Sequence, residues 1–377
     1  MKTEKKGILF INYSIGNGGS EKMFLYIMNG SELVDCKKII FLYNNSTRHS
    51  YGSLIKVPYT KYTYSKESDY FFINLVKRIR ILLRIIRKEN VSLIFSFSSQ
   101  GALLAVVGKI LLPLRKIGVA VRLGSVFSNL FYNPKGSKVK RKIWEQLTLI
   151  FTYKHVDKIV CSTLYMKQEL LNRSKRLKSK IVVIKNYVDK ENVNSLANEP
   201  VDIKGKYFIS VGRLEKEKNY FEILEAFFAI KDRTKINLLI LGDGSLREEI
   251  HQTILNCGLK KRVILLGFKR NPYKYIAKAE GLILFSDFEG LPNVVIEALM
   301  CKTPVIVSNY LGVEDVIRHR WNGIIVKRRN KKGLALALEE LSEDEELRKK
   351  LVKNGYRKAL EFTTSITKYE QLINGLL

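Results

Sequence analysis

The sequence has few cysteines, few histidines and no long apolar run. Its four cysteines are scattered along 377 residues, with no Cys-x-x-Cys pair and no neighbouring histidine: Cys36, Cys161, Cys257 and Cys301. This spacing predicts neither a disulfide framework nor a zinc site, and it indicates free thiols in a reducing compartment. The longest apolar stretch, Gly101–Val107, ends just before Lys109 and is far too short to span a bilayer.

A secretory signal pattern is also lacking at the start of the sequence. Residues 1–6 run directly into an apolar strand at Ile8–Asn12. With 46% apolar residues, 27% charged residues and only seven prolines, the chain does not have the composition of a disordered protein. Its length predicts two or three domains.

Acidic residues are scarce in the first half. The formal net charge is +30, and residues 1–199 hold 35 Lys and Arg against 13 Asp and Glu, a net of +22. Such an asymmetry indicates a polyanionic partner, which could be an anionic membrane surface, a nucleic acid or a phosphorylated substrate. A lysine-rich, merely solvated surface is the alternative.

Short apolar runs alternate with amphipathic stretches throughout the chain. The predicted strands are Ile8–Asn12, Lys38–Tyr43, Leu93–Phe97, Gly118–Arg122 and Lys158–Ser162 in the first half, and Tyr207–Val211, Asn237–Leu241, Val263–Leu266, Gly281–Phe285 and Pro304–Val307 in the second. This alternation predicts parallel sheets covered by helices on both faces. The polar segment 186–206 is the predicted linker. We therefore expect an α/β fold with two Rossmann-like domains, residues 1–195 and 196–377, facing a central cleft, where ligands bind at the carboxyl ends of strands.

A glycine-rich turn follows the first strand. Residues 16–21 read Gly-Asn-Gly-Gly-Ser-Glu and precede a helical stretch, so their backbone could approach an anion at a helix N-terminus. The pattern is neither Gly-x-Gly-x-x-Gly nor a P-loop. A tight turn without a ligand is an equal alternative.

Two cations follow the first strand of the second half. Arg213 and Lys218 lie in one predicted loop, Val211–Asn219, before a helix. An arginine that binds bidentately and a lysine that acts as a point charge suit a diphosphate. Because Glu215 and Glu217 intervene, a solvated loop of mixed charge is the alternative.

Two acids accompany a third strand end. Glu289 lies in the predicted loop after Gly281–Phe285, and Glu297 lies in the second turn of the helix that Pro292 opens. Carboxylates there could accept hydrogen bonds from sugar hydroxyls or act as acid and base. Three backbone amides at the helix start could bind phosphate or sugar hydroxyls, those of Gly290, Leu291 and Asn293. We expect no metal, because no third oxygen-rich ligand cluster lies near Asp287 and Glu289.

Together, these segments resemble the nucleotide-binding domain of the retaining glycosyltransferases of the GT-B fold, in the large family four that builds polysaccharides and lipid-linked glycans. The matching segments are VGRLEKEKN (211–219), LLILGDGSLREEI (238–250), VILLGF (263–268) and FSDFEGLPNVVIEALMCKTPVIVSN (285–309). They cover about residues 207–326, and the Glu289-x₇-Glu297 pattern is the most specific of them. The match in the first half is limited to Gly18–Glu21 and Lys185–Asp189.

The resemblance implies a role for each matching residue of the second half. Arg213 and Lys218 are expected to hold the diphosphate and stabilise the leaving nucleotide, and Glu289 is expected to contact the donor sugar. Glu297 is expected to hold the ribose hydroxyls. The backbone near Phe268 and Lys269 is expected to frame the base.

The first half departs from the family pattern at one position. Many relatives place a histidine near the donor sugar, whereas the matching loop here reads Val119–Ser125 and contains Arg122 instead. We expect Arg122 to occupy that place and to orient the sugar or carry charge, since arginine cannot act as a base at neutral pH. This agrees with retaining chemistry in which the donor's own phosphate deprotonates the acceptor. Gly18 and Gly19 are expected to approach the donor phosphates.

The resemblance also implies the partners. The expected donor is a nucleotide-diphosphate sugar, with UDP as the preferred nucleotide, and the expected acceptor is a polyprenyl-diphosphate-linked glycan in bacterial O-antigen or capsule synthesis. No metal or other cofactor is expected, because Arg, Lys and helix dipoles supply the electrostatic stabilisation. The last helix, Thr364–Leu377, is expected to cross back to the first domain.

A basic amphipathic helix is predicted at Leu75–Lys88. Its apolar side could lie on an anionic leaflet, or it could cover the sheet and leave a basic outer face. With a second basic cluster at Lys135–Lys142, it predicts a peripheral location on the inner face of the cytoplasmic membrane.

Two other functions compete with the glycosyltransferase. A nucleotide-sugar epimerase shares the two-domain fold, but the Arg213, Lys218, Glu289 and Glu297 set and the missing histidine argue against it. A nucleic-acid-binding protein would need an aromatic–basic platform, which the sequence does not show, and the two acids would repel phosphates.

Overall fold

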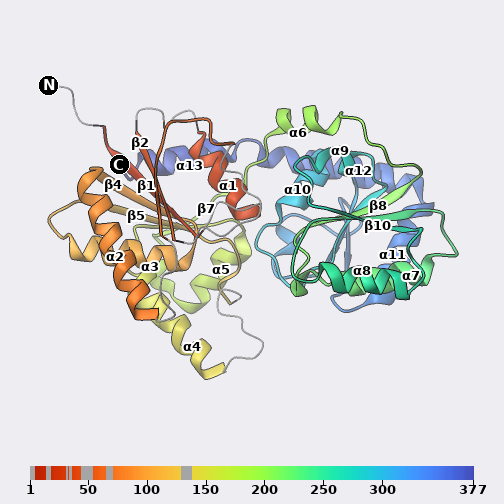
Figure 1. The fold of residues 1–377 in the computed structure, drawn as a ribbon, viewed down its shortest axis with the longest axis horizontal. Coiled ribbons are helices and arrows are strands. Elements are labelled where there is room, and N and C mark those ends of the chain that lie inside the picture. The colour runs from red at the N-terminus through yellow and green to blue at the C-terminus, as the bar shows by residue number, and fades with distance from the viewer. Residues whose placement is uncertain are drawn as a thin grey trace. The chain divides into compact units, whose positions relative to one another are not determined.

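The computed structural model describes residues 5–13, 18–30, 33, 36–43, 54–64, 71–128 and 138–377. The chain divides into two compact units (Figure 1). Unit 1 comprises Met1–Tyr187 together with Thr364–Leu377, and unit 2 comprises Val188–Thr363.

Unit 1 is built on a seven-stranded sheet in which every pairing is parallel, in the order β3-β2-β1-β4-β5-β6-β7. The strands are β1 (Gly7–Asn12), β2 (Lys37–Leu42), β3 (Thr60–Thr63), β4 (Val91–Ser96), β5 (Gly118–Arg122), β6 (Lys158–Cys161) and β7 (Ile181–Val183). Successive residues of β1 enter different cores, Leu9 and Ile11 on one face and Ile8 and Phe10 on the other. Both faces are therefore buried, which explains why the strand is an unbroken apolar run.

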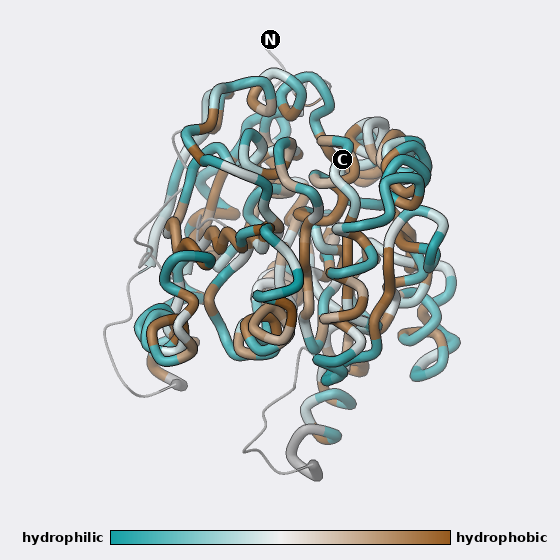
Figure 2. The backbone as a smooth tube through the Cα atoms, turned by 90° about the vertical axis from the view of Figure 1, so that its right-hand side faces the viewer, coloured by the Kyte–Doolittle hydropathy of each residue, from teal (hydrophilic) through white to brown (hydrophobic). Residues whose placement is uncertain are grey.

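Helices cover both faces of this sheet. The helices are α1 (Gly19–Met28), α2 (Phe71–Lys88), α3 (Ser99–Leu111), α4 (Lys138–Leu147), the π-helical η4 (Thr148–Tyr153), α5 (Leu164–Arg173) and α13 (Ser365–Asn374), with a 3₁₀ turn at Lys175–Leu177. One core joins α2, α3 and α5 to the sheet, and the other joins α1 and α13 to it. In the hydropathy view of Figure 2, the extended strands are mostly hydrophobic, whereas the helices alternate between hydrophobic and hydrophilic residues.

The basic helix α2 covers the sheet with its apolar side. Leu82, Ile85 and Ile86 are buried in the core, whereas Arg84 and Arg87 are exposed. The sequence allowed the apolar side of this helix either to lie on a leaflet or to cover the sheet. In the structure it covers the sheet, and a basic face points outward. None of the helices in the described part of the chain combines the length and apolarity that crossing a membrane requires.

Unit 2 repeats this architecture with six parallel strands in the order β10-β9-β8-β11-β12-β13. The strands are β8 (Tyr207–Val211), β9 (Asn237–Leu241), β10 (Val263–Gly267), β11 (Gly281–Leu284), β12 (Val305–Ser308) and β13 (Ile324–Val326). The helices are α6 (Lys190–Ala197), α7 (Tyr220–Ile230), α8 (Arg247–Asn256), α9 (Tyr273–Ala277), α10 (Asn293–Met300), α11 (Lys331–Glu343) and α12 (Glu345–Ala359), with 3₁₀ turns at Lys216–Lys218, Val313–Asp315 and Leu360–Phe362.

The boundary between the units precedes α6, whereas the sequence placed it after residue 195. Helix α6 belongs to unit 2 because Val193 is buried in the core that also holds Tyr207 and Tyr273. Asn271 Nδ2 also donates to the Leu196 carbonyl at 2.9 Å. The polar composition of segment 186–206 thus reflects a surface helix as well as a connection.

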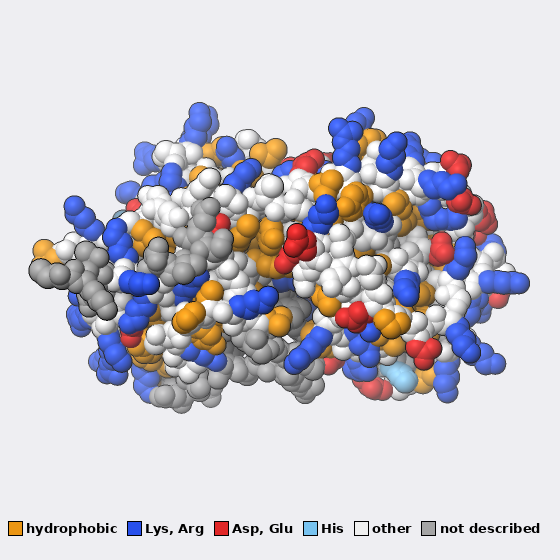
Figure 3. All heavy atoms as spheres, turned by 90° about the horizontal axis from the view of Figure 1, so that it is seen from above, with side chains coloured by type: hydrophobic (Ala, Val, Ile, Leu, Met, Phe, Trp, Pro, Cys, Tyr) orange, Lys and Arg blue, Asp and Glu red, His pale blue; other side chains and the backbone are white. Residues whose placement is uncertain are grey.

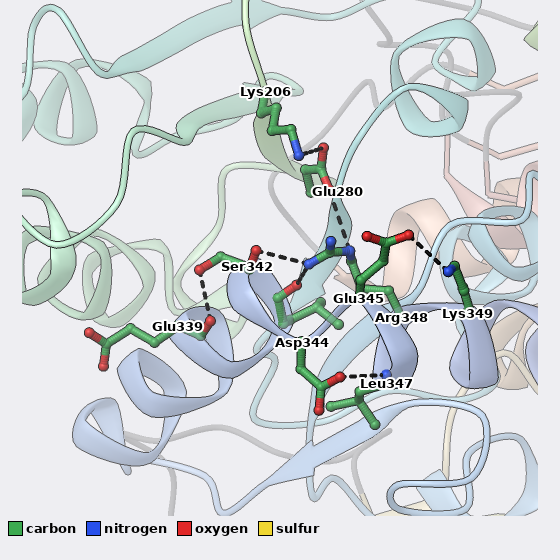
Figure 4. Close-up of polar contacts among 10 residues, drawn as sticks. Lys206, Glu280, Glu339, Ser342, Asp344, Glu345, Leu347, Arg348 and Lys349 are labelled. Carbon is green, nitrogen blue, oxygen red and sulfur yellow. Dashed lines mark hydrogen bonds and ion pairs between the residues drawn. The ribbon is translucent and has the colours of Figure 1, made fainter.

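A polar network fixes α12 at the amino edge of the second sheet (Figure 4). Arg348 Nη1 donates to the carbonyls of Leu341 and Ser342 at 2.6 and 2.9 Å, and Arg348 Nε lies 3.7 Å from Glu280. Glu280 also lies 3.4 Å from Lys206. Since Lys206 and Glu280 precede β8 and β11, this network lies at the edge opposite to the carboxyl ends of the strands.

The chain's return to unit 1 provides a test of the fold. Ile373 of α13 is fully buried in the core that contains β1, so Ile373→Ala should destabilise unit 1 by about 2–5 kcal/mol. Amide hydrogen exchange of β1, followed by mass spectrometry, should accelerate accordingly. Gln371→Ala is the matched control, because Gln371 is exposed on the same helix. Equal protection in the two variants would contradict the packing of α13.

Candidate active site

The loop after β8 is tied to the loop after β11. Asn219 adopts a left-handed conformation with φ +50°, which asparagine tolerates better than most residues. Its Nδ2 donates to the Phe285 carbonyl and to Asp287 Oδ1, both at 3.1 Å. The Asp287 amide in turn donates to the Glu217 carbonyl at 2.9 Å. These bonds hold the two loops side by side at the carboxyl edge of the sheet.

This tie brings two of the predicted site residues into contact. Lys218 Nζ lies 2.5 Å from Glu289 Oε1, and the two side chains are only 16% and 13% exposed. Arg213 differs, because its side chain is 61% exposed and pairs with Glu217 at 2.9 Å across one turn. Exposed pairs of this kind contribute little stability, so Arg213 can exchange Glu217 for a ligand anion at small cost.

The start of α10 carries the next group of predicted residues. The residues Gly290 and Leu291 are buried in the loop before the helix, and Pro292 caps it in an extended conformation. Helix N-termini hold N–H groups without intrahelical partners, which suit phosphate or sugar oxygens. Glu297 lies on the second turn of α10 and is 7% exposed. Most of its surface is therefore shielded from solvent.

The predicted base-binding residues follow β10 at the same edge. The chain passes Gly267 with φ +71° and then reaches Phe268 and Lys269. The Gly242 amide, after β9, donates to the Gly267 carbonyl at 2.9 Å. A Cβ at Gly267 would lie 3.1 Å from the Arg247 guanidinium, so glycine leaves room for that side chain.

Two glycines that the sequence analysis did not single out shape the Arg213 loop. A Cβ at Gly242, which has φ +146°, would lie 1.8 Å from the Gly212 carbonyl oxygen, and one at Gly244 would lie 2.5 Å from the Leu214 carbonyl oxygen. The Leu214 amide donates to the Asp243 carbonyl at 3.0 Å. Only glycine permits this approach of two backbones. The Gly-Asp-Gly sequence directly after a predicted strand is the signal that could have revealed it.

Two buried hydroxyls lie close to Glu289. Burial raises the pKa of Tyr220, and the charge of Glu289 adds to the rise. Burial also raises the pKa of Tyr310 well above its usual value, again with Glu289 adding to it. Both phenols are therefore neutral at physiological pH. The Tyr310 hydroxyl has no hydrogen-bond partner within the described part of the structure. No sequence pattern marked either tyrosine.

The predicted residues of unit 1 have different environments. Gly18 precedes α1 in an extended conformation (φ −82°, ψ 172°), and Gly19 is the first residue of that helix. Both lie at a helix N-terminus, as the sequence predicted. The earlier part of the same motif, including Gly16, lies outside the described residues.

Arg122 ends β5, but its side chain is 2% exposed and already engaged. Its Nε donates to Tyr369 Oη at 3.1 Å, and its Nη2 donates to Asn186 Oδ1 at 2.6 Å. Only Nη1 is buried without a partner among the described residues. Arg122 therefore joins β5 to α13 and to the segment after β7, and one N–H-bearing nitrogen is left for any ligand.

The predicted residues fall into two groups by unit. Unit 2 holds Arg213, Lys218, Phe268, Lys269, Glu289, Gly290, Leu291, Asn293 and Glu297, and unit 1 holds Gly18, Gly19 and Arg122. Within unit 2 all of them follow the carboxyl ends of β8, β10 and β11. Among the described residues, no group of three or more His, Cys, Asp or Glu side chains is placed to hold a metal ion.

Each unit has the parallel, doubly wound α/β architecture in which ligands bind at the carboxyl ends of the strands. Residues 194–358 match the model of the family described as glycosyl transferases group 1. This segment therefore belongs to that family, as the resemblance implied.

Curated relatives support the same family. An N-acetylgalactosamine-N,N'-diacetylbacillosaminyl-diphospho-undecaprenol 4-alpha-N-acetylgalactosaminyltransferase of Campylobacter jejuni is 35% identical over 207 residues, 52% of this chain and 56% of that protein. The chain thus spans little more than half of this relative. A UDP-Gal:alpha-D-GlcNAc-diphosphoundecaprenol alpha-1,3-galactosyltransferase of Escherichia coli is 28% identical over 292 residues, 73% of each chain.

Solved structures extend the likeness of fold to nearly the whole chain. Anabaena Alr3699/HepE, in complex with UDP and glucose, has a TM-score of 0.77 at 16% identity and covers 98% of this chain and 99% of its own. WaaG, a glycosyltransferase involved in lipopolysaccharide biosynthesis, has a TM-score of 0.75 at 12% identity and covers 98% and 100%. The predicted GT-B fold with two Rossmann-like α/β domains is thereby confirmed.

The buried Tyr310 hydroxyl leads to a stability prediction. Tyr310→Phe should leave the thermal midpoint unchanged or raise it, because it removes a buried polar group that has no hydrogen-bond partner among the described residues. Tyr207→Phe is the matched control in unit 2, since Tyr207 Oη donates to the Tyr275 carbonyl at 2.8 Å. Its loss should cost about 1 kcal/mol. Differential scanning calorimetry compares the two, and a larger loss for Tyr310→Phe would reveal a partner for that hydroxyl.

Proposed function

We propose that the protein is a retaining glycosyltransferase that moves a sugar from a UDP-sugar to a polyprenyl-diphosphate-linked glycan during surface polysaccharide synthesis. The observation that carries the proposal is the Lys218–Glu289 pair, which lies beside Arg213 and the start of α10 at one sheet edge. Relatives named for transfer to undecaprenyl-diphosphate glycans, one of them from UDP-Gal, support the donor and acceptor classes.

In the proposed mechanism, positive charge at the carboxyl edge of unit 2 stabilises the departing diphosphate. Arg213 and Lys218 would bind its oxygens, with the amides of Gly290, Leu291 and Asn293 at the start of α10 adding further donors. Charge that develops on the leaving group is stabilised more in the transition state than in the ground state, which lowers the barrier.

The remaining residues would hold the donor. Glu297 would accept hydrogen bonds from the ribose hydroxyls, and the backbone at Phe268 and Lys269 would frame the base. Gly18 and Gly19, at the N-terminus of α1, would approach the phosphates from unit 1.

Glu289 has two proposed states. Without donor it neutralises Lys218 across 2.5 Å. When the diphosphate takes Lys218, the Glu289 carboxylate becomes available to accept hydrogen bonds from the donor sugar. The pair would therefore keep two charges compensated in a site that is mostly shielded from water.

Retention is proposed to proceed on one face of the sugar. The bond from the anomeric carbon to the phosphate oxygen breaks, the acceptor oxygen bonds to that carbon on the same face, and the acceptor proton passes to the leaving phosphate. No protein base is needed in this scheme. Arg122 would contribute charge through Nη1, since its other nitrogens are bonded to Tyr369 and Asn186.

We further propose that the protein works on the inner face of a bacterial cytoplasmic membrane. Arg80, Arg84, Arg87 and Lys88 are exposed on α2. Each basic residue near an anionic leaflet contributes about 1 kcal/mol. In Figure 3, basic side chains lie over both units, whereas acidic ones are more frequent over unit 2. The second basic cluster, Lys135–Lys142, lies partly outside the described residues: 135–137 are not described, and of 138–141 only the backbone is.

Product analysis tests the whole proposal. The full chain would be incubated with a panel of nucleotide-diphosphate sugars and synthetic polyprenyl-diphosphate saccharides, with products followed by mass spectrometry. Nuclear magnetic resonance would give the anomeric configuration of the new linkage. An inverted anomer would refute retention, and a preference for another nucleotide would refute UDP. A lack of transfer to every lipid-linked saccharide would refute the acceptor class.

Removal of the two cations should slow transfer without unfolding the protein. Arg213→Ala and Lys218→Ala should each lower the turnover rate about a hundred- to a thousandfold, because each removes a charge contact in the transition state. Arg233→Ala is the control, since Arg233 pairs with Glu339 at the surface of unit 2. Steady-state kinetics on folded protein give the result. Near-normal turnover in both site variants would place the diphosphate elsewhere.

The two carboxylates should affect different kinetic constants. Glu297→Ala should weaken nucleotide binding, because ribose contacts persist from the ground state to the transition state, whereas Glu289→Ala should mainly lower kcat. Isothermal titration with UDP and initial-rate kinetics separate the two effects. If both substitutions changed both constants to the same extent, the assigned roles would be wrong.

A further inference from the structure

Unit 1 presents a row of large apolar side chains to solvent. The row lies on α4 and on η4, which continues it without a break, and its members are 37% to 57% exposed: Ile143, Trp144, Leu147, Ile150 and Phe151. Their spacings of three and four residues place them on one side of the helix. We call these five residues the apolar stripe. Figure 1 shows α4 projecting from the rest of its unit.

The other side of the same helix is firmly packed. Leu149 and Tyr153 are buried in the core of unit 1, and Tyr153 Oη lies 3.0 Å from Ser99 Oγ of α3. Glu145 pairs with Arg173 of α5 at 2.7 Å. The orientation of the helix is therefore fixed, and the apolar stripe faces outward because the polar and apolar groups of the opposite side hold it there.

A contiguous exposed stripe of this size differs from ordinary surface apolar residues. Leu164 and Leu336 are more exposed, at 63% and 64%, but each stands alone in its segment. Soluble proteins tolerate single exposed residues, whereas contiguous patches mark a surface that is covered in the working state.

Charge identifies what covers the stripe. Lys138, Lys140, Arg141 and Lys142 precede it in the chain, and the exposed Lys154 follows it. The one acid of segment 138–154, Glu145, is on the packed side. Apolar and aromatic residues framed by cations at both ends have the composition of a helix that lies in the interface of an anionic bilayer, with tryptophan at headgroup depth. Two copies of so basic a surface would repel each other.

We propose that α4 and η4 form a membrane-insertion element that seats the apolar stripe at the boundary between the headgroups and acyl chains of an anionic bilayer. This deepens the proposed membrane location and rests on it for its biological purpose. It assigns α2 and α4 different tasks: α2 contributes charge alone, whereas α4 contributes apolar burial, which salt does not screen.

Vesicle binding tests the proposal with the full chain. Phosphatidylglycerol–phosphatidylcholine vesicles are compared with pure phosphatidylcholine at low and high salt. The wild-type chain should keep part of its affinity for the anionic vesicles at high salt. The triple variant Ile143→Ser, Ile150→Ser, Phe151→Ser should lose that part, with affinity about tenfold or more below wild type. Leu164→Ser, at a single exposed leucine of the same unit, is the matched control and should bind like wild type.

A charge variant separates the two helices. Arg80→Gln, Arg84→Gln, Arg87→Gln should lower the affinity at low salt and leave the salt-resistant part intact. Complete release of the wild-type chain by salt would overturn the insertion proposal, as would unchanged salt-resistant binding of the stripe variant. Light scattering of the lipid-free chain tests whether a second copy covers the apolar stripe instead. A wild-type dimer that is absent in the stripe variant would assign the stripe to a second copy and overturn the proposal.

Tryptophan fluorescence tests insertion independently and needs only one conservative substitution. The chain has two tryptophans, Trp144 and Trp321. Brominated phosphatidylglycerol should quench Trp144, and the quenching should disappear in Trp144→Phe, where only Trp321 remains. Equal quenching in both proteins would overturn insertion.

Thermal shifts with UDP-sugars, which need no membrane, should be the same in the stripe variant and the wild type. A wild-type chain that inserts but binds no nucleotide sugar would refute the proposed function and leave the insertion element standing.

Discussion

The contact between Lys218 and Glu289 depends on one constraint of parallel sheets. Every strand of such a sheet ends at the same edge, so loops that are distant in the chain emerge side by side. The loops after β8 and β11 meet because these strands are neighbours, and Asn219 then fixes their separation through Phe285 and Asp287. Because Asn219 directly follows Lys218, the same bonds hold the Lys218 loop beside the loop that carries Glu289.

The close approach of glycine backbones completes this edge. Gly242 and Gly244 let the loop after β9 lie directly against the backbone of Gly212 and Leu214. Arg213 is therefore carried on a braced segment even though its own side chain is exposed. A well-supported backbone with a solvent-exposed cation suits a site that must first admit a charged ligand and then hold it.

Sequence patterns could predict the main strands but not the short ones. Long apolar runs such as β1 and β8 are visible because burial on both faces demands them. Strands β3, β7 and β13 hold four, three and three residues, too few to show a period.

For the site, motifs could locate Arg213, Lys218, Glu289 and Glu297 on strand ends. The ion pair of Lys218 with Glu289 depends on tertiary packing, which no local pattern records. The same holds for the buried Tyr310 hydroxyl, which has no hydrogen-bond partner among the described residues. Arg122 shows the same limit. Its place at the end of β5 can be predicted from the sequence, but its burial against Tyr369 and Asn186 cannot. Asn186 lies just before the chain enters unit 2, and Tyr369 lies after the chain has returned to unit 1.

Helices α2 and α4 show why the pattern of a helix does not determine its partner. Both are basic, and both carry apolar residues at helical spacing, so periodicity alone gives them the same interpretation. In α2 the apolar residues Leu82, Ile85 and Ile86 pack against the sheet and are buried in the core. Among the described side chains of α4 and η4, the apolar ones that reach the core are Leu149 and Tyr153, whereas the apolar stripe stays exposed. An apolar face that the core has already buried cannot also enter a bilayer, whereas one that the core leaves exposed still has its full hydrophobic free energy to gain. We therefore propose apolar membrane contact for α4, whose apolar face stays exposed, and not for α2, whose basic face is more conspicuous in the sequence.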